Sequence, residues 1–99
     1  MMSVLKKEFI DRMAERGGIT KKAAREGIEL FIETLIDYMA EDEKVMIKGF
    51  GRFEMKTYKE RIGKVPLSGA ECIIPEHKKM RFYASDLLGG RIEEMRKEE

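Results

Sequence analysis

The 99-residue sequence contains no tryptophan, two prolines, one cysteine and one histidine, and it lacks a long apolar run. A single cysteine, Cys72, excludes a disulfide within the chain, and a single histidine, His77, leaves no group of residues with metal-ligand spacing. We therefore expect no metal and no cofactor. Because no segment has the length of a membrane span or the pattern of a signal peptide, we also expect no membrane partner and a cytoplasmic location.

The sequence also lacks the patterns of an enzyme. It contains no pair of nucleophile and base and no glycine-rich loop built to hold phosphate. Its length predicts one domain over residues 1–99, and a domain of this size buries only a limited fraction of its surface. A binding protein that completes its core with a second protomer is therefore favoured over an enzyme.

Basic charge is concentrated in one part of the chain. The net charge is +1, but residues 52–82 carry eight Lys or Arg against four Asp or Glu. Residues 1–51 carry nine against ten, and residues 83–99 carry three against five. A local excess of positive charge is typical of a surface that binds a polyanion, although a solvated charged surface is the simpler interpretation of composition alone.

The N-terminal part predicts two amphipathic helices. The first follows Ser3, a candidate N-cap, and ends at Gly17-Gly18. The second follows Thr20, whose hydroxyl suits an N-cap. Its apolar stripe comprises Ala24, Ile28, Phe31, Ile32, Leu35, Ile36 and Met39.

From Lys44 the apolar period drops from helical spacing to two, which predicts strands over residues 44–82. Val45 and Ile47 begin the sheet, and a glycine turn at residues 49–51 follows. The next strand places Phe53, Met55 and Thr57 on one face and Arg52, Glu54, Lys56 and Tyr58 on the other. After a loop at Gly63–Gly69 the chain returns to Pro75, which suits an edge or a junction, and then forms a short strand over residues 79–82.

The C-terminal segment predicts a short last helix. Ser85 is its candidate cap, and Gly89-Gly90 is expected to interrupt it, leaving a charged tail or a frayed helix over about residues 89–99. Together these patterns predict an α+β fold with two N-terminal helices, an antiparallel sheet, a long protruding β-ribbon arm and a short C-terminal helix. The aromatic residues on apolar faces are expected in the core or in a dimer interface; they are Phe31, Phe50, Phe53 and Phe82.

Four segments, in this order and spacing, resemble the bacterial histone-like HU/IHF family of DNA-binding proteins from Lys6 to about Leu88. The most specific is GFGRFE, which starts at Gly49 and is similar to the Gly-Phe-Gly-x-Phe-Glu turn of that family. The others are KKEFIDRMA in the first helix, the capped start TKKAA of the second, and the arm RIGKVPLSG that leads to Pro75.

The resemblance implies an intertwined dimer, of one chain or of two paralogues, whose β-arms wrap double-stranded DNA in the nucleoid, including nicked, bent or junction DNA. In this family Lys and Arg neutralise phosphates without reading sequence, and apolar wedges inserted from the minor groove bend the duplex. We find no side-chain set that would read base edges in the major groove, which favours low sequence specificity. The residues expected at DNA are Lys6, Arg52, Lys56, Tyr58, Lys59, Arg61, Lys64, Val65, Pro66, Lys78 and Arg81.

The tip of the arm is unusually apolar for a turn in water, with Val65, Pro66 and Leu67 in succession. A rigid proline ring without an N–H suits a wedge that enters a base step. Several expected basic residues are missing, since Tyr58, Ile73, Tyr83 and Asp86 stand where the family often has a basic side chain. The alternative is therefore an HU-like dimer with weakened DNA binding, whose main partner is another protein or a special nucleic-acid structure.

Overall fold

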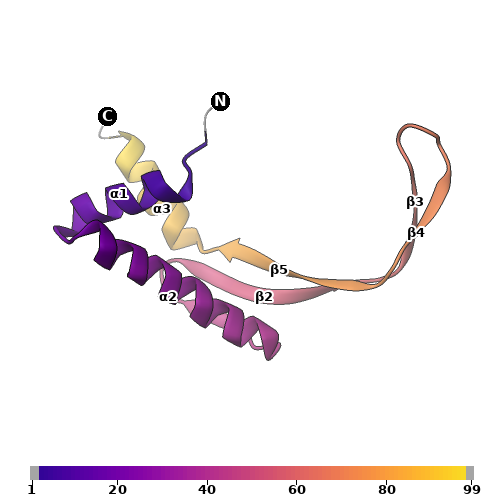
Figure 1. The fold of residues 1–99 in the computed structure, drawn as a ribbon, viewed down its shortest axis with the longest axis horizontal. Coiled ribbons are helices and arrows are strands. Elements are labelled where there is room, and N and C mark those ends of the chain that lie inside the picture. Colours follow the sequence, from indigo (N-terminus) through magenta and orange to yellow (C-terminus); the bar gives the residue numbers. More distant parts are fainter. Residues whose placement is uncertain (1–2, 98–99) are drawn as a thin grey trace. The chain divides into compact units, whose positions relative to one another are not determined.

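The computed structural model describes residues 3–97, which form helices and antiparallel strands as expected for an α+β protein (Figure 1). The chain divides into two compact units, a helical unit up to Asp37 and a ribbon unit from Tyr38 onward. The boundary falls within the second helix.

The helical unit contains α1, Lys6–Gly17, and most of α2, Lys21–Ala40. Ile10 and Ala14 of α1 pack with Ala24 of α2 in a small buried cluster. Gly18 ends α1 in the left-handed conformation, with φ of 62°, which favours glycine. The Thr20 hydroxyl accepts a hydrogen bond from the Ala23 N–H at 3.0 Å, which confirms the predicted cap of α2.

The predicted cap of α1 is wrong. The helix begins at Lys6 rather than directly after Ser3, and its N-cap residue is Leu5, which makes no side-chain cap hydrogen bond. Leu5 adopts an extended conformation and its carbonyl accepts a hydrogen bond from the Phe9 N–H at 3.0 Å. The backbone alone therefore starts α1, and Glu8 in the first turn complements the positive end of the helix dipole.

The ribbon unit is built on a three-stranded antiparallel sheet in the order β1, β2, β5. The strands are β1, Val45–Ile47; β2, Gly51–Tyr58; and β5, His77–Ala84. The last strand is longer than the predicted residues 79–82, because it pairs with β2 along its whole length from Tyr58↔His77 to Gly51↔Ala84. Gly51 fits a close approach, since a Cβ there would collide with the Tyr83 carbonyl oxygen.

The arm is a second hairpin at the far end of β2 and β5, and Figure 1 shows it turning away from their direction. Its strands are β3, Arg61–Lys64, and β4, Glu71–Ile74. Residues 59–60 and 75–76 separate it from the sheet and belong to neither pairing, which places Pro75 at the junction as predicted. At the tip, the Val65 N–H donates to the Ala70 carbonyl at 2.8 Å and closes the loop.

The C-terminal helix α3 runs without interruption from Asp86 to Lys97, so the predicted break at Gly89-Gly90 and the predicted tail from residue 89 are wrong within the described residues. Each glycine costs about 1 kcal/mol relative to alanine in a helix. Interactions at both helix ends offset that cost. The Ser85 hydroxyl caps the helix by accepting a hydrogen bond from the Leu88 N–H at 3.2 Å. Asp86 in the first turn and Arg96 and Lys97 in the last turn have the charges that the helix dipole favours.

The apolar face of the sheet carries an aromatic cluster. The ring centroids of Phe53 and Phe82 lie 4.8 Å apart, and those of Phe50 and Phe82 lie 5.0 Å apart. Phe53 is buried, whereas Phe50 and Phe82 remain more than a third exposed in a single chain. The predicted core position of Phe53 is therefore confirmed, and the other two rings leave apolar surface uncovered.

Candidate nucleic-acid interface

The polar face of the β2–β5 ribbon collects the basic side chains predicted from the sequence. Because side chains alternate along a strand, residues 52, 54, 56 and 58 of β2 share a face with residues 77, 79, 81 and 83 of β5. Four cations lie on this face against one carboxylate, that of Glu54. The cations are Arg52, Lys56, Lys79 and Arg81.

Two of these cations lie directly opposite each other. Lys56 pairs in register with Lys79, and like charges at opposed positions of a sheet destabilise it. The carboxylate does not relieve this repulsion, because Glu54 lies at 3.4 Å from the Lys44 ammonium and 3.8 Å from Arg52 Nε. The ribbon thus holds a repulsive pair of cations that an external anion would neutralise.

Aromatic rings support the cations at both ends of the face. The Arg52 guanidinium lies over the Tyr83 ring, 4.4 Å from its centroid, and the Lys56 ammonium lies 5.6 Å from the centroid of Tyr58. Tyr58 in turn stacks on His77 with centroids 5.5 Å apart and ring planes 15° apart. These contacts restrict the long side chains without neutralising their charge.

The structure separates some of the other predicted residues from this face. Lys78 pairs with Thr57 on the opposite face, and its ammonium lies 2.9 Å from the Asp42 carboxylate. Lys59 lies in the junction, and Arg61 and Lys64 lie on β3 in the arm. Their expected contacts with DNA stay predictions.

Lys79 was missed by the sequence analysis, although the alternation of strand side chains was sufficient to find it. Once Arg81 is placed on the polar face, Lys79 must share that face and Lys78 must lie on the other. The short strand predicted at residues 79–82 was paired with no partner, so its faces remained unassigned.

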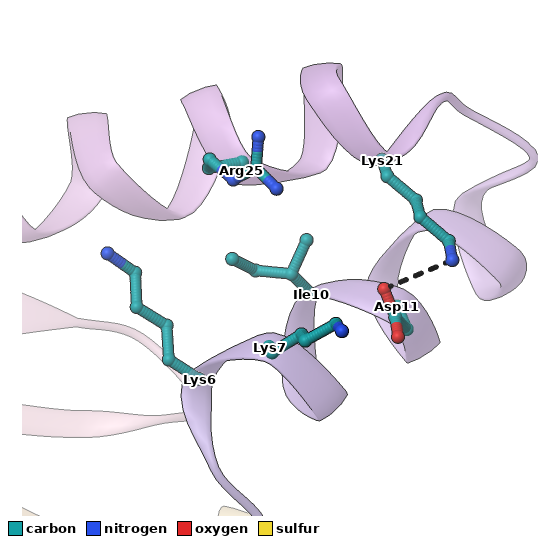
Figure 2. Close-up of a pocket in the computed structure, with 6 residues that line it drawn as sticks. All are labelled: Lys6, Lys7, Ile10, Asp11, Lys21 and Arg25. Carbon is teal, nitrogen blue, oxygen red and sulfur yellow. Dashed lines mark ion pairs between the residues drawn. The ribbon is translucent and has the colours of Figure 1, made fainter.

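Lys6 belongs to the helical unit, where it lies at a second basic cluster. A pocket of about 440 Å³ in this unit is lined by four cations around Ile10 and Asp11. Figure 2 shows these side chains. The Lys6 ammonium lies 3.3 Å from Glu29 Oε1, and the Lys21 ammonium lies 3.5 Å from Asp11 Oδ1. The remaining cations that line the pocket are Lys7 and Arg25.

The tip and the arm expose apolar side chains. Leu67 is fully exposed, and Ile62 and Ile73, which oppose each other across β3 and β4, are 71% and 69% exposed. Val65 is 41% exposed. Cys72 of β4 is also exposed.

Neither a metal-ligand cluster nor a membrane-spanning helix occurs among residues 3–97. That part of the chain contains no group of three or more His, Cys, Asp or Glu side chains able to hold a metal ion. Its helices also include none with the length and apolarity needed to cross a bilayer.

Comparison with known proteins places this geometry in a family. Residues 4–93 match the family described as bacterial DNA-binding protein. Integration host factor subunit alpha of Pseudomonas putida is 32% identical over 93 residues, which are 94% of this chain and 93% of the relative. The same subunit of Neisseria gonorrhoeae is 33% identical, with 93% of each chain covered.

Solved structures agree with the sequence relatives. The HU protein in an Anabaena HU–DNA co-crystal structure is similar with a TM-score of 0.80 and 31% identity, over 90% of this chain and 97% of that one. HU from Thermotoga maritima is similar with a TM-score of 0.62 and 27% identity, over 90% of this chain and 98% of that one. No enzyme is among these relatives. The fold, the basic ribbon and the match over residues 4–93 together show that the chain belongs to the HU/IHF family of bacterial DNA-binding proteins.

Proposed function

We propose that this chain is an architectural protein that binds duplex DNA across the polar face of the β2–β5 ribbon and bends it with the arm tip. The observation that carries the proposal is the opposed pair Lys56↔Lys79, flanked on the same face by Arg52 and Arg81. A duplex presents one negative charge per roughly 1.7 Å of its axis, so phosphates relieve the repulsion between these cations and release counterions. The related Anabaena HU was crystallised with DNA.

The proposed contacts are the residues predicted from the sequence, with Lys79 added and Lys78 left out because it faces away from the other ribbon cations. On the ribbon, Arg52 and Lys56 are held by the rings of Tyr83 and Tyr58, which lowers the entropy lost when they bind phosphate. None of these contacts depends on base identity, so the protein reads little sequence. It has no catalytic role in this proposal.

The arm tip supplies the bend. Leu67 is fully exposed at a loop closed by the Val65–Ala70 hydrogen bond, and Pro66 lies between Val65 and Leu67. An opened base step in the minor groove offers these side chains an apolar surface that water does not. The cost of unstacking is recovered through the protein surface that the bent duplex then contacts.

We further propose that the protein acts as a dimer, of two identical chains or with a paralogue, in the nucleoid. Apolar side chains of α2, of the β1–β2 turn and of β5 remain exposed in one chain, among them Phe31, Ile36, Phe50 and Phe82. A second protomer that covers them would complete the core of a small domain. Sedimentation equilibrium at micromolar concentration tests this, and a folded monomer would contradict it.

A mobility-shift titration on linear, nicked and four-way-junction DNA, at two salt concentrations, tests the proposed function. We expect binding to all three, with log K falling linearly with log salt by about 0.9 per phosphate neutralised. Because Tyr83 and Asp86 stand where the family often has lysine, the slope should be shallower than that of a typical family member. An absence of salt-dependent binding to every DNA would contradict the proposal.

The exposed pair Ile62↔Ile73 on the arm favours the alternative that the main partner is not intact duplex DNA. An arm with two exposed isoleucines on one face suits a protein partner or a nucleic acid with unstacked bases better than it suits intact duplex. Binding to junction DNA alone would support the second of these, and stable folding without any DNA binding would favour the first.

A further inference from the structure

His77 has a defined tautomer at the junction between ribbon and arm. Its Nδ1 lies 2.9 Å from the Pro75 carbonyl oxygen, and because a carbonyl only accepts, Nδ1 carries the hydrogen and donates. Nε2 has no hydrogen-bond partner among residues 3–97. The bond to Pro75 therefore persists in both charge states of the ring, and protonation changes only Nε2, which becomes a second donor on a cationic ring.

On the polar face of the β2–β5 ribbon, the charged side chains nearest to His77 along the strands are basic. The His77 ring stacks on Tyr58, and the Lys56 ammonium lies near the same tyrosine ring. Lys79 lies on the same face, two residues further along β5. The charged residues adjacent in the chain or across the junction are Glu76, Lys78, Lys59 and Glu60. Of these, Lys78 already lies against Asp42 on the other face. A charged imidazole would thus add a further cation beside the Lys56↔Lys79 pair.

We infer that His77 is a proton-linked phosphate contact, through which DNA binding becomes tighter as the pH falls. The inference rests on the proposed DNA contact of the polar face. A phosphate that accepts a hydrogen bond from Nε2 favours the positively charged ring, because it places an opposite charge beside it. Bound protein then holds more protons than free protein, and by linkage each proton taken up strengthens binding. Histidine is the side chain whose charge ordinarily changes between about pH 5 and 8.

The experiment measures DNA affinity over one series of salt concentrations, and from it the salt slope, at about pH 8 and at about pH 5.5. For the native protein we expect the salt slope at the lower pH to steepen by roughly 0.9 per protomer, and the affinity at 0.15 M salt to rise about fivefold per protomer. Proton uptake on mixing with DNA in weak buffer near neutral pH gives a second, direct readout.

Two variants divide the possible causes. His77→Asn keeps a donor positioned for the Pro75 carbonyl but has no titrating group, and His77→Phe keeps a ring for the Tyr58 stack but neither donor nor charge. We expect both to bind DNA with a salt slope that is the same at the two pH values, and without proton uptake. Far-ultraviolet circular dichroism of both variants establishes that they fold.

The outcomes distinguish this inference from the function on which it rests. DNA binding by the native protein with a flat pH profile overturns the role of His77 and leaves the proposed function intact. A pH dependence that both variants retain also overturns it. A native protein that binds no DNA at either pH overturns both the inference and the proposed function.

Discussion

The β2–β5 ribbon and the β3–β4 arm are continuous parts of one unit, yet they present opposite chemistry. The ribbon displays four cations against one carboxylate on its polar face. The arm displays the exposed pair Ile62↔Ile73 and a fully exposed Leu67, with Arg61 and Lys64 as the basic residues of β3. In the proposed function, this contrast assigns most of the DNA affinity to the charge of the ribbon and the bending of DNA to the apolar surface of the arm.

Gly51 in the ribbon and Gly63 in the arm differ in what an added Cβ would meet. A Cβ at Gly51 in the ribbon would collide with backbone, the Tyr83 carbonyl oxygen. A Cβ at Gly63 in the arm would lie 2.9 Å from Ile74 Cδ1, the far end of a flexible side chain. The ribbon is therefore fixed by its backbone packing, whereas the arm is able to adjust by a rotamer change.

The largest expected effect comes from removing the opposed cations of the ribbon. Lys56→Ala combined with Lys79→Ala should reduce the salt slope by roughly 1.8 per protomer and weaken DNA binding at 0.15 M salt about 30-fold per protomer, because two phosphate contacts are lost. Fluorescence anisotropy with a labelled duplex measures both. Arg96→Ala combined with Lys97→Ala removes equal charge from α3 and is the matched control. Equal losses in the two double variants would assign the effect to net charge rather than to the ribbon.

The next effect concerns stability and contrasts the two glycines. Gly51→Ala should lower the free energy of unfolding by about 2–3 kcal/mol, since backbone must move to admit the methyl group. Gly63→Ala should change it by less than about 1 kcal/mol, because Ile74 can rotate and alanine costs less chain entropy than glycine in a strand. Urea unfolding midpoints measure both. A large loss in Gly63→Ala would show that the arm is as rigid as the ribbon.

At the tip, Pro66→Ala should reduce DNA bending while leaving the melting temperature of the protein nearly unchanged, because the wedge is exposed and supports no core. Fluorescence transfer between the ends of a duplex measures the bend at saturating protein. Lys64→Ala is the paired variant, and we expect it to weaken binding about fivefold per protomer while the residual complex stays bent. Unchanged bending in Pro66→Ala would remove Pro66 from the mechanism and favour a protein partner for the tip.

The smallest effect is expected for Lys78→Ala. This lysine faces away from the other ribbon cations and pairs with Asp42, both side chains being more than half exposed. Such exposed pairs contribute about 0.2–1 kcal/mol, so stability should fall slightly, and the salt slope should fall by less than in Lys56→Ala. A loss of the full 0.9 in slope would instead return Lys78 to the interface predicted from the sequence.

Sequence reasoning succeeded where the signal is local or periodic. Thr20 was assigned as a cap from its own side chain, and the two faces of β2 followed from the alternation of Phe53 and Met55 with Arg52 and Lys56. Both features depend on residues within one turn or one strand, so no knowledge of distant partners was needed.

The predictions that were wrong or missing concern two kinds of feature. One depends on several small energy contributions acting together, and the other depends on the register between paired strands. Gly89-Gly90 weakens α3 locally, but the cap at Ser85 and the terminal charges outweigh that cost. The stack of Tyr58 on His77 and the opposition of Lys56 and Lys79 require the pairing of β2 with β5, whose strands are separated by the whole arm. That register is set by tertiary packing and is not readable from either strand alone.

The placement of the tyrosines gives the protein an optical reporter. The sequence has no tryptophan and three tyrosines, and two of these, Tyr58 and Tyr83, lie under Lys56 and Arg52 on the polar face. Ultraviolet emission of the unlabelled protein therefore originates largely from the surface proposed to meet DNA. Excitation at the red edge of tyrosine absorption, corrected for the absorbance of the duplex, would follow occupancy of the ribbon separately from events at the arm tip, which carries no aromatic side chain.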